Sequence, residues 1–403
     1  MKHLFVCLVA LLAFAQPLRP CSSAVISGKA TPDGRPLLWK HRDTDFLRNH
    51  VAFVKGEKYD FIANVNSDNF AALKEAWMGT NEAGFALMNT QSYNLVEVKD
   101  GEERGAANGR IIYRALEVCA TVQDFCHFLD TIAKPSLIEA NFGVIDAQGG
   151  AAMFEVDYHN YVMYDANNPK DAPYGYIART NFSFAGEVNE GAGYVRYMEV
   201  EQVLMKTSAT GGITPQLIFN DLSRSFRNQM LGIDLRSGAF NRPQGSGWFV
   251  DQDFIPRRST SCSIVVQGVK KDEKPELTTM WTVLGYPPTG VAFPLWVEGA
   301  DTQLPALMAY DAKEGAAPMS CWSLRLADEV FAYRQGMGTS RYLHWERLYS
   351  PATGKGYLIE LAPVEQSVFD RTAPVLEAWR SRGKINLPEQ KKLYEELQTL
   401  IPM

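Results

Sequence analysis

The N-terminal segment constrains this chain more than any other feature of its sequence. An apolar stretch from Leu4 to Ala15 follows Lys2 and His3, and it is too short to span a bilayer comfortably. This pattern predicts an export signal that is later removed. A strand-like run then begins at Cys21 and continues to Gly28. We therefore expect the processed chain to open with a β-strand whose first residue is a cysteine.

The site of processing is less well defined than the signal itself. The small-residue rule for cleavage is best met at Ala13-Phe14-Ala15, which would leave residues 16–20 in front of Cys21. Residues 1–20 are therefore read as a signal peptide with a short pro-segment. Lipoprotein processing would also leave a modified cysteine here, but it requires a small residue where the chain has Pro20. A lipid anchor on Cys21 remains as the alternative.

Composition narrows the classes of function. The net charge is −6, and the basic residues are scattered rather than gathered into a surface that could follow a phosphate backbone. With 46% hydrophobic residues, the chain can bury a large core, and beyond the leader no apolar stretch reaches the length of a membrane span. We expect an exported protein, periplasmic or extracellular, that acts on a small molecule, with no nucleic-acid partner. The sequence does not indicate an oligomeric state.

The six cysteines and six histidines show no metal-ligand spacing, so neither a metal nor an organic cofactor is expected. Cys119 and Cys126 lie close together across an apparent helix junction. They either form a disulfide in an oxidising compartment or are two buried thiols on apolar helix faces.

Strands and helices alternate irregularly along the chain. Extended patterns occur at residues 22–27, 37–41, 51–54, 75–79, 85–90, 141–145 and 151–156, and again at 262–269, 278–284 and 291–297. Helical periodicity occurs at residues 110–119, 125–132, 194–205 and 216–226, and in a tail from 364 to the C-terminus. Because a regular strand-helix-strand rhythm is missing, the pattern favours a layered α+β fold, with residues 21–403 as one domain and 364–403 as a helical extension.

The chemistry of an N-terminal cysteine is specific. A thiol attacks carbonyl groups as its thiolate, and a free α-amine on the same residue, with a pKa of about 7.7 to 8.0, is a suitable base. His41 is the only histidine near Cys21 in sequence, and a Cys/His pair remains an alternative without a motif behind it.

Several motifs in order along the chain are similar to one family. These are Cys21-Ser22-Ser23, the run from Gly34 to Asp43, the run from Gly79 to Ala86 with Asn89, the run from Asn141 to Asp146, and Arg179-Thr180-Asn181-Phe182. Together they resemble the penicillin acyltransferase and choloylglycine hydrolase group of N-terminal nucleophile hydrolases. The resemblance implies a four-layer αββα sandwich and cleavage or transfer of acyl groups at amide bonds.

The resemblance also implies roles for individual residues. Cys21 matches the nucleophile, and Asp43 matches an acid that holds the α-amine and orients its proton transfer. Asn181 matches an asparagine whose side-chain amide stabilises the oxyanion, and Asn89 matches a second such donor. The alternatives are a turn residue for Asp43, a strand end for Asn89 and a glycosylation sequon at Asn181-Phe182-Ser183.

Three cationic residues are candidates for supporting roles. The family usually has arginine where this chain has Lys40, and Arg42 is the nearby guanidinium. Arg196 lies where the family has an arginine-containing helix start, and we expect it on the helix surface. Cys262, which opens a later strand, is expected to face the core.

These observations predict an exported cysteine N-terminal nucleophile hydrolase. Its substrate would be a non-peptide linear amide such as an N-acyl amino acid, a bile-acid conjugate or a β-lactam side chain. It would release the acyl group to water or transfer it to another amine. The alternatives are a dipeptidase with the same type of nucleophile and a lipid-anchored surface or binding protein.

Overall fold

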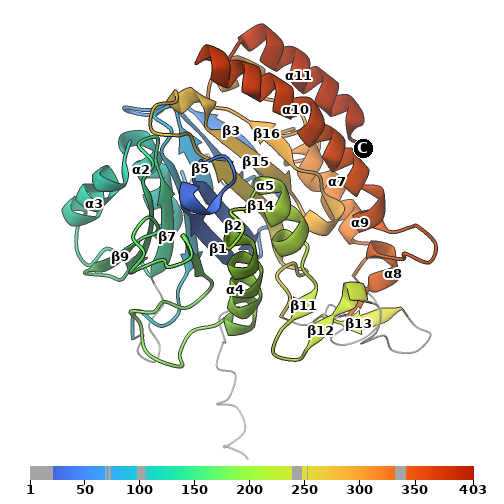
Figure 1. The fold of residues 1–403 in the computed structure, drawn as a ribbon, viewed down its shortest axis with the longest axis horizontal. Coiled ribbons are helices and arrows are strands. Elements are labelled where there is room, and N and C mark those ends of the chain that lie inside the picture. The colour runs from blue at the N-terminus through green and yellow to red at the C-terminus, as the bar shows by residue number, and fades with distance from the viewer. Residues whose placement is uncertain are drawn as a thin grey trace, which may run out of the picture.

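Two antiparallel sheets lie face to face at the centre of the molecule (Figure 1). The computed structural model describes residues 21–403 except residues 69, 71–73, 98–104, 106, 238–246, 252 and 332–341. The predicted signal peptide and pro-segment, residues 1–20, thus lie outside the described residues.

The first sheet carries the N-terminal strand of the described chain. Its order is β10-β1-β2-β14-β15-β16. The bounds are β1 Ser22–Ile26, β2 Leu37–Asp43, β10 Tyr176–Arg179, β14 Thr260–Gln267, β15 Thr279–Leu284 and β16 Phe293–Leu295. β1 pairs with β2 on one side and with β10 on the other, so the hairpin predicted to start at Cys21 is confirmed. The residue before β1 is therefore flanked by the ends of two strands.

The second sheet runs in sequence order from β3 to β9. Its strands are β3 Asn49–Val54, β4 Phe61–Asn66, β5 Met78–Asn81, β6 Ala86–Gln91, β7 Ala140–Ile145, β8 Ala151–Val156 and β9 Tyr161–Asp165. Its inner face contacts the first sheet, since β6 and β7 both touch β2. Side chains of β2 can therefore contact side chains of β6 and β7 between the sheets.

Helices cover the outer faces of both sheets. α2 (Asn108–Val118) and α3 (Val122–Thr131) pack on the seven-stranded sheet, where Leu116 and Phe125 join its apolar core. α4 (Tyr194–Ser208) and α5 (Pro215–Leu217), which continues into a π-helix at Ile218–Ser223, cover the other sheet. The result is a four-layer αββα sandwich, which confirms the predicted fold.

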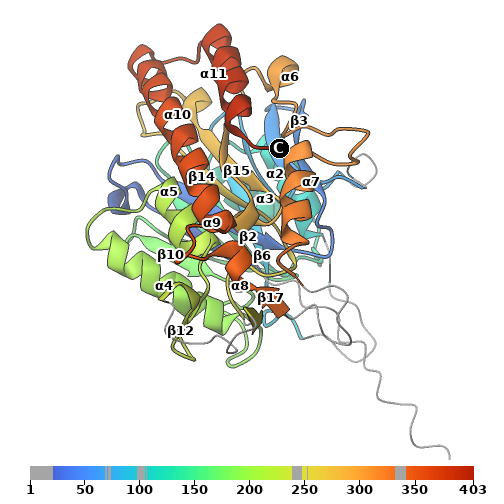
Figure 2. The same cartoon turned by 90° about the vertical axis from the view of Figure 1, so that its right-hand side faces the viewer.

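The C-terminal helices form the predicted extension. α10 (Ala362–Arg382) and α11 (Leu387–Leu400) lie together along the first sheet (Figure 2). Trp379 of α10 packs edge-on against Trp296, with 5.1 Å between ring centroids. Glu365 forms a buried ion pair with Arg224 at 2.6 Å. Both contacts tie the extension to the main body.

The remaining elements are short. The helices are the 3-10 turns Gly28–Ala30, Leu235–Ser237, Pro275–Leu277 and Pro287–Thr289, and α6 Ala300–Gln303, α7 Pro318–Ala327, α8 Trp345–Leu348 and α9 Tyr357–Glu360. The strands are β11 Arg227–Asn228, β12 Ile233–Asp234, β13 Trp248–Val250 and β17 Tyr342–His344. Among the described residues, no helix combines the length and apolarity that crossing a bilayer requires. Cys119 and Cys126 are both buried free thiols, so the disulfide alternative is not what the structure contains.

Candidate active site

Cys21 lies immediately before β1, in the gap between the ends of β2 and β10. Its backbone nitrogen donates a hydrogen bond to Asn181 Oδ1 at 2.8 Å, and its Sγ lies 3.7 Å from the carbonyl oxygen of Asp43. Only 6% of the residue is exposed. Three sequence-predicted residues from three separate segments therefore meet at one point.

Hydrogen bonds fix both the side chain of Asn181 and the backbone on either side of this residue. Its Nδ2 donates to the carbonyl oxygen of Gln91 at 2.8 Å. The amide of Asn141, on β7, donates to the carbonyl oxygens of Thr180 and Phe182, the two residues that flank Asn181 in sequence. Because these contacts join the two sheets, the position of Asn181 depends on the packing of the whole sandwich.

Arg196 is buried beside Cys21, and the expectation of a helix-surface arginine is wrong. It projects from the first turn of α4, and only 1% of it is exposed. It donates to the carbonyl oxygen of Cys21, to Ser22 Oγ at 3.1 Å and to Asn181 Oδ1 at 2.9 Å. Its Nε lies 3.2 Å from Asp253. Desolvation by burial lowers its pKa to about 10, so the guanidinium remains charged at neutral pH.

Asp43 ends β2, but its carboxylate lies away from the Cys21 nitrogen. Thr260 Oγ1 donates to its Oδ1 at 2.5 Å. Arg257 Nε lies 3.1 Å from its Oδ2, an ion pair by distance whose N–H is not aligned for a hydrogen bond. Burial raises the pKa of Asp43 to about 6, against the opposing effects of Arg257 and Arg196. In the described structure, the oxygen that accepts from the Cys21 nitrogen comes from Asn181, not from Asp43.

Lys40 and Asn89 form a second buried contact at the site. Lys40 Nζ donates to Asn89 Oδ1 and to the carbonyl oxygen of Trp77, both at 2.8 Å. Lys40 is 2% exposed and Asn89 is 4% exposed. Desolvation lowers the pKa of Lys40 to about 8, while the Cys21 thiol raises it, which places the lysine and the thiol within electrostatic reach of each other.

Arg42 and Cys262 face the same space between the sheets. Arg42 Nη2 donates to Asn66 Oδ1 at 2.8 Å, and its guanidinium stacks over the Trp77 ring at 4.5 Å. Cys262 is buried on β14 as expected, and burial raises its pKa to about 11. Its thiol is therefore protonated and unreactive at neutral pH.

His41 does not serve Cys21. Its Nε2 contacts Thr260 Oγ1 at 3.2 Å, and no contact joins it to Cys21 in the part of the chain that the structure describes. Burial and two nearby arginines lower its pKa well below the ordinary value, so the ring is neutral. The Cys/His alternative therefore has no support in the geometry.

Three residues of the site escaped the sequence analysis. Arg257 and Asp253 hold each other at 2.7 Å and extend the charge network from Arg196 to Asp43, while Thr260 bonds the Asp43 carboxylate. Asp253 and Arg257 lie in the segment just before β14, and Thr260 is the first residue of that strand, where no motif or periodicity marks them. A run of charged residues directly before a buried strand was the one available signal.

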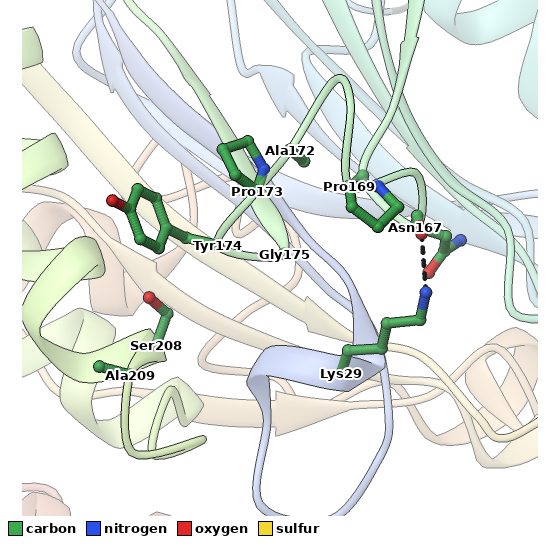
Figure 3. A pocket seen from close by; sticks show the side chains of 10 residues that line it. Lys29, Asn167, Pro169, Ala172, Pro173, Tyr174, Gly175, Ser208 and Ala209 are labelled. Atoms are coloured by element: carbon green, nitrogen blue, oxygen red, sulfur yellow. Dashed lines mark hydrogen bonds between the residues drawn. The ribbon is translucent and has the colours of Figure 1, made fainter.

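The cavities of the described surface include one beside the candidate site and one away from it. One, of about 360 Å³, is lined by Thr44, Asp251, Arg257 and Arg258 together with Asp45, Leu47 and Ser259, and so opens beside the end of β2. The other, of about 290 Å³, lies between Lys29, Asn167 and Tyr174 and includes no residue of the candidate site (Figure 3). No group of three or more metal-ligating side chains occurs in the described ranges. The first cavity is the one adjacent to the reactive groups.

Part of the chain matches a known protein family. Residues 46–202 match the model of the family described as acyl-coenzyme A:6-aminopenicillanic acid acyl-transferase. This part of the chain is thus similar to the penicillin acyltransferase family that its motifs resemble. No curated protein sequence matches the chain.

Solved structures that match the chain are distant from it in sequence. A conjugated bile acid hydrolase mutant from Clostridium perfringens is 11% identical, covers 69% of this chain and 92% of its own, and has a TM-score of 0.42. Penicillin V acylase from Agrobacterium tumefaciens is 14% identical, with coverages of 69% and 86% and a TM-score of 0.35. The Caenorhabditis elegans ortholog of N-acylethanolamine-hydrolyzing acid amidase is 12% identical, with coverages of 63% and 93% and a TM-score of 0.38.

Proposed function

We propose that this protein is an exported amidase or acyltransferase in which Cys21, freed of the residues before it, is the nucleophile. The observation that carries this proposal is the hydrogen bond of 2.8 Å between the Cys21 nitrogen and Asn181 Oδ1, directly before the first strand of the β1–β2 hairpin. Removal of residues 1–20 would turn that nitrogen into an α-amine. The amine would then be held in place by an acceptor that is itself fixed by Arg196.

The reaction would proceed in two acyl transfers. The α-amine of Cys21 accepts the proton of Sγ, and the thiolate attacks the carbonyl carbon of the substrate amide. The resulting oxyanion is stabilised by amide donors, of which Asn89 Nδ2 is the best placed, because its oxygen is already bound by Lys40. The carbon–nitrogen bond breaks as the ammonium of Cys21 returns the proton to the leaving amine. Water or a second amine then attacks the thioester and regenerates the free thiol.

Arg196 supports the base in this scheme. A fixed positive charge close to an amine disfavours its protonated form and lowers its pKa. An N-terminal amine has an ordinary pKa of about 7.7 to 8.0, so such a shift increases the neutral, basic fraction near pH 7. Asp253 and Asp43, both within the same network, limit the size of this shift.

The substrate would be an N-acyl amino acid, a bile-acid conjugate or a related linear amide. The cavity of about 360 Å³ beside β2 is lined by Arg257 and Arg258, which suits a leaving amine that carries a carboxylate. A panel of N-acyl amides with and without a carboxylate on the amine side tests this directly. We expect the carboxylate-bearing amides to show the lower KM.

The nucleophile is tested by Cys21→Ala, measured with the processed protein after its N-terminus has been determined by mass spectrometry. We expect an unmodified Cys21 at the N-terminus and a loss of turnover of roughly 10⁶-fold in the variant. Cys321→Ala, a buried free thiol on α7, is the matched control and should retain activity. Full activity in Cys21→Ala, or a diacylglyceryl adduct on Cys21, would overturn the proposal.

A further inference from the structure

Lys40 is a buried cation without a carboxylate partner in the described part of the chain. Its Nζ bonds only to neutral acceptors, the carbonyl oxygen of Trp77 and Asn89 Oδ1, and lies 5.7 Å from the Trp77 ring. Two other buried cations of the site differ, because Arg196 and Arg257 are both paired with Asp253. Burying an unpaired ammonium is costly, so such a group is a candidate for a role in the site.

The ammonium of Lys40 determines the orientation of the Asn89 amide. An ammonium has three donors and no acceptor, whereas an asparagine amide can present either its oxygen or its NH₂ group. The two ends of an amide are interchangeable in shape, and the hydrogen-bond network decides between them. With Lys40 in contact at 2.8 Å, the oxygen of Asn89 must face the lysine. The Nδ2 group is then directed away from it, and it makes no hydrogen bond to any described residue.

Strand positions and contacts place Asn89 near the Cys21 region. Asn89 lies on β6, and Gln91, two residues further on the same strand, accepts a hydrogen bond from Asn181 Nδ2. Lys40 lies on β2, opposite Ser23 of β1, two residues after Cys21. Asn89 thus contacts a lysine that lies within electrostatic reach of the Cys21 thiol, and it shares its strand with the residue that binds Asn181.

We propose that Lys40 is a positioning residue that acts through Asn89. It holds the Asn89 oxygen so that the amide NH₂ group is presented to the oxyanion that forms on attack by Cys21. The inference rests on the proposed function, because it assumes that the reaction passes through this oxyanion. It assigns no direct contact between Lys40 and the substrate.

A double-variant cycle tests whether Lys40 acts through Asn89. Lys40→Met and Asn89→Ala are each expected to lower kcat by roughly 10²-fold, the effect of losing one oxyanion donor. The double variant should lose no more than the single variants, because each removes the same interaction. Lys29→Met, at an exposed lysine whose Nζ bonds to a backbone carbonyl, is the matched control and should leave kcat unchanged.

Two results would overturn the inference. One is a kcat for Lys40→Met within about threefold of the unmodified protein, less than one hydrogen bond contributes. The other is a double variant in which the two losses multiply to roughly 10⁴-fold, which would show that the residues act independently.

A second pair of variants covers the case in which Lys40→Met does not fold. Lys40→Arg keeps a group that can only donate, while Lys40→Gln introduces an amide that can donate or accept and so no longer fixes Asn89. We expect Lys40→Gln to lose more kcat than Lys40→Arg, with both folded by circular dichroism, and equal losses would contradict the inference. Cys21→Ala is assayed in parallel. If it is active, the proposed function fails; if it is inactive while Lys40→Gln is fully active, only the role of Lys40 fails.

Discussion

The two sides of Cys21 are built on different principles. On the amine side, the nitrogen and carbonyl oxygen of Cys21 meet Asn181 and Arg196, and Arg196 is paired with Asp253. On the thiol side, Lys40 bonds to Asn89 and to a backbone carbonyl, with no carboxylate partner among the described residues. On the amine side, the positive charge of Arg196 is therefore balanced by Asp253, and the hydrogen bonds of this network hold the backbone of Cys21 in position. The thiol side holds a net positive charge where negative charge develops during attack.

Loss of Asn181 should have the largest effect among the residues around Cys21. Asn181→Ala removes the acceptor of the Cys21 nitrogen and the link to Gln91, so the base is no longer oriented. We expect kcat to fall by roughly 10³-fold, the upper range for one preorganised amide. Steady-state kinetics on a linear N-acyl amide measure this. Asn168→Ala, an asparagine in an exposed turn, serves as the control. An Asn181→Ala variant with kcat near that of the unmodified protein would remove the amine side from the mechanism.

Arg196, which also lies on the amine side of Cys21, should act on the amine through its positive charge. Arg196→Met removes a cation close to the amine, so the amine pKa should rise. Because the amine must be neutral to accept a proton, the acid limb of the kcat profile should move to higher pH, and kcat at pH 7 should fall by roughly 10²-fold. Arg196→Lys keeps the charge and should move the limb less. A profile that keeps its acid limb in Arg196→Met would show that Arg196 only supports the fold.

The sequence predicted the sheet core better than the charge network. β8 has the predicted bounds, and the capping box at Thr121 starts α3 close to where its pattern indicated. β4 and β9 were missed. β4 is buried at every position, including Asn64 and Asn66, and β9 is a partly exposed edge strand whose sequence does not alternate regularly between apolar and polar residues.

In the candidate site, too, the residues within motifs were predicted, whereas the residues placed by long-range contacts were not. Cys21, Asn89 and Asn181 were found because each lies within a recognisable motif. Arg196 was assigned to a helix surface because helical position says nothing about a partner 175 residues away in sequence. Arg257 had only the charged run before β14 as a signal, since its contact with Asp43 depends on the pairing of β2 with β14. Long-range register, which one sequence does not reveal, decides such contacts.

On the thiol side, we expect the protonation of Lys40 to determine the alkaline limb of the pH profile of kcat. Lys40 faces Cys21 just before β1, Arg42 on its own strand and Cys262 on β14, with neutral Asn89 and Trp77 on the opposite side. Its lowered pKa of about 8 means that it loses its proton as the pH rises through that value. The neutral amine can accept a hydrogen bond, so the orientation of Asn89 is no longer fixed.

Lys40→Arg replaces this group with one that stays charged far above neutral pH. We expect the alkaline limb of kcat to move up by at least about one pH unit, with a change at pH 7 smaller than tenfold. Stopped assays between pH 6 and pH 10 measure the limb, and Lys29→Arg is the control at an exposed lysine. An alkaline limb that stays near pH 8 in Lys40→Arg would assign it to another group.

Cys262 should have the smallest effect, although it shares the thiol side with Lys40. Its thiol contacts Asn64 Oδ1 at 3.6 Å, and burial holds it in the neutral form, so it contributes no charge to the site at pH 7. Cys262→Ala should change kcat/KM by less than about threefold. In the unmodified protein, an alkylating reagent should modify Cys21 and leave Cys262 intact, as peptide mass spectrometry would reveal, because only a thiolate reacts readily. If Cys262→Ala lost activity to the same extent as Cys21→Ala, the assignment of one nucleophile to the head of β1 would fail, and with it the contrast between the two sides.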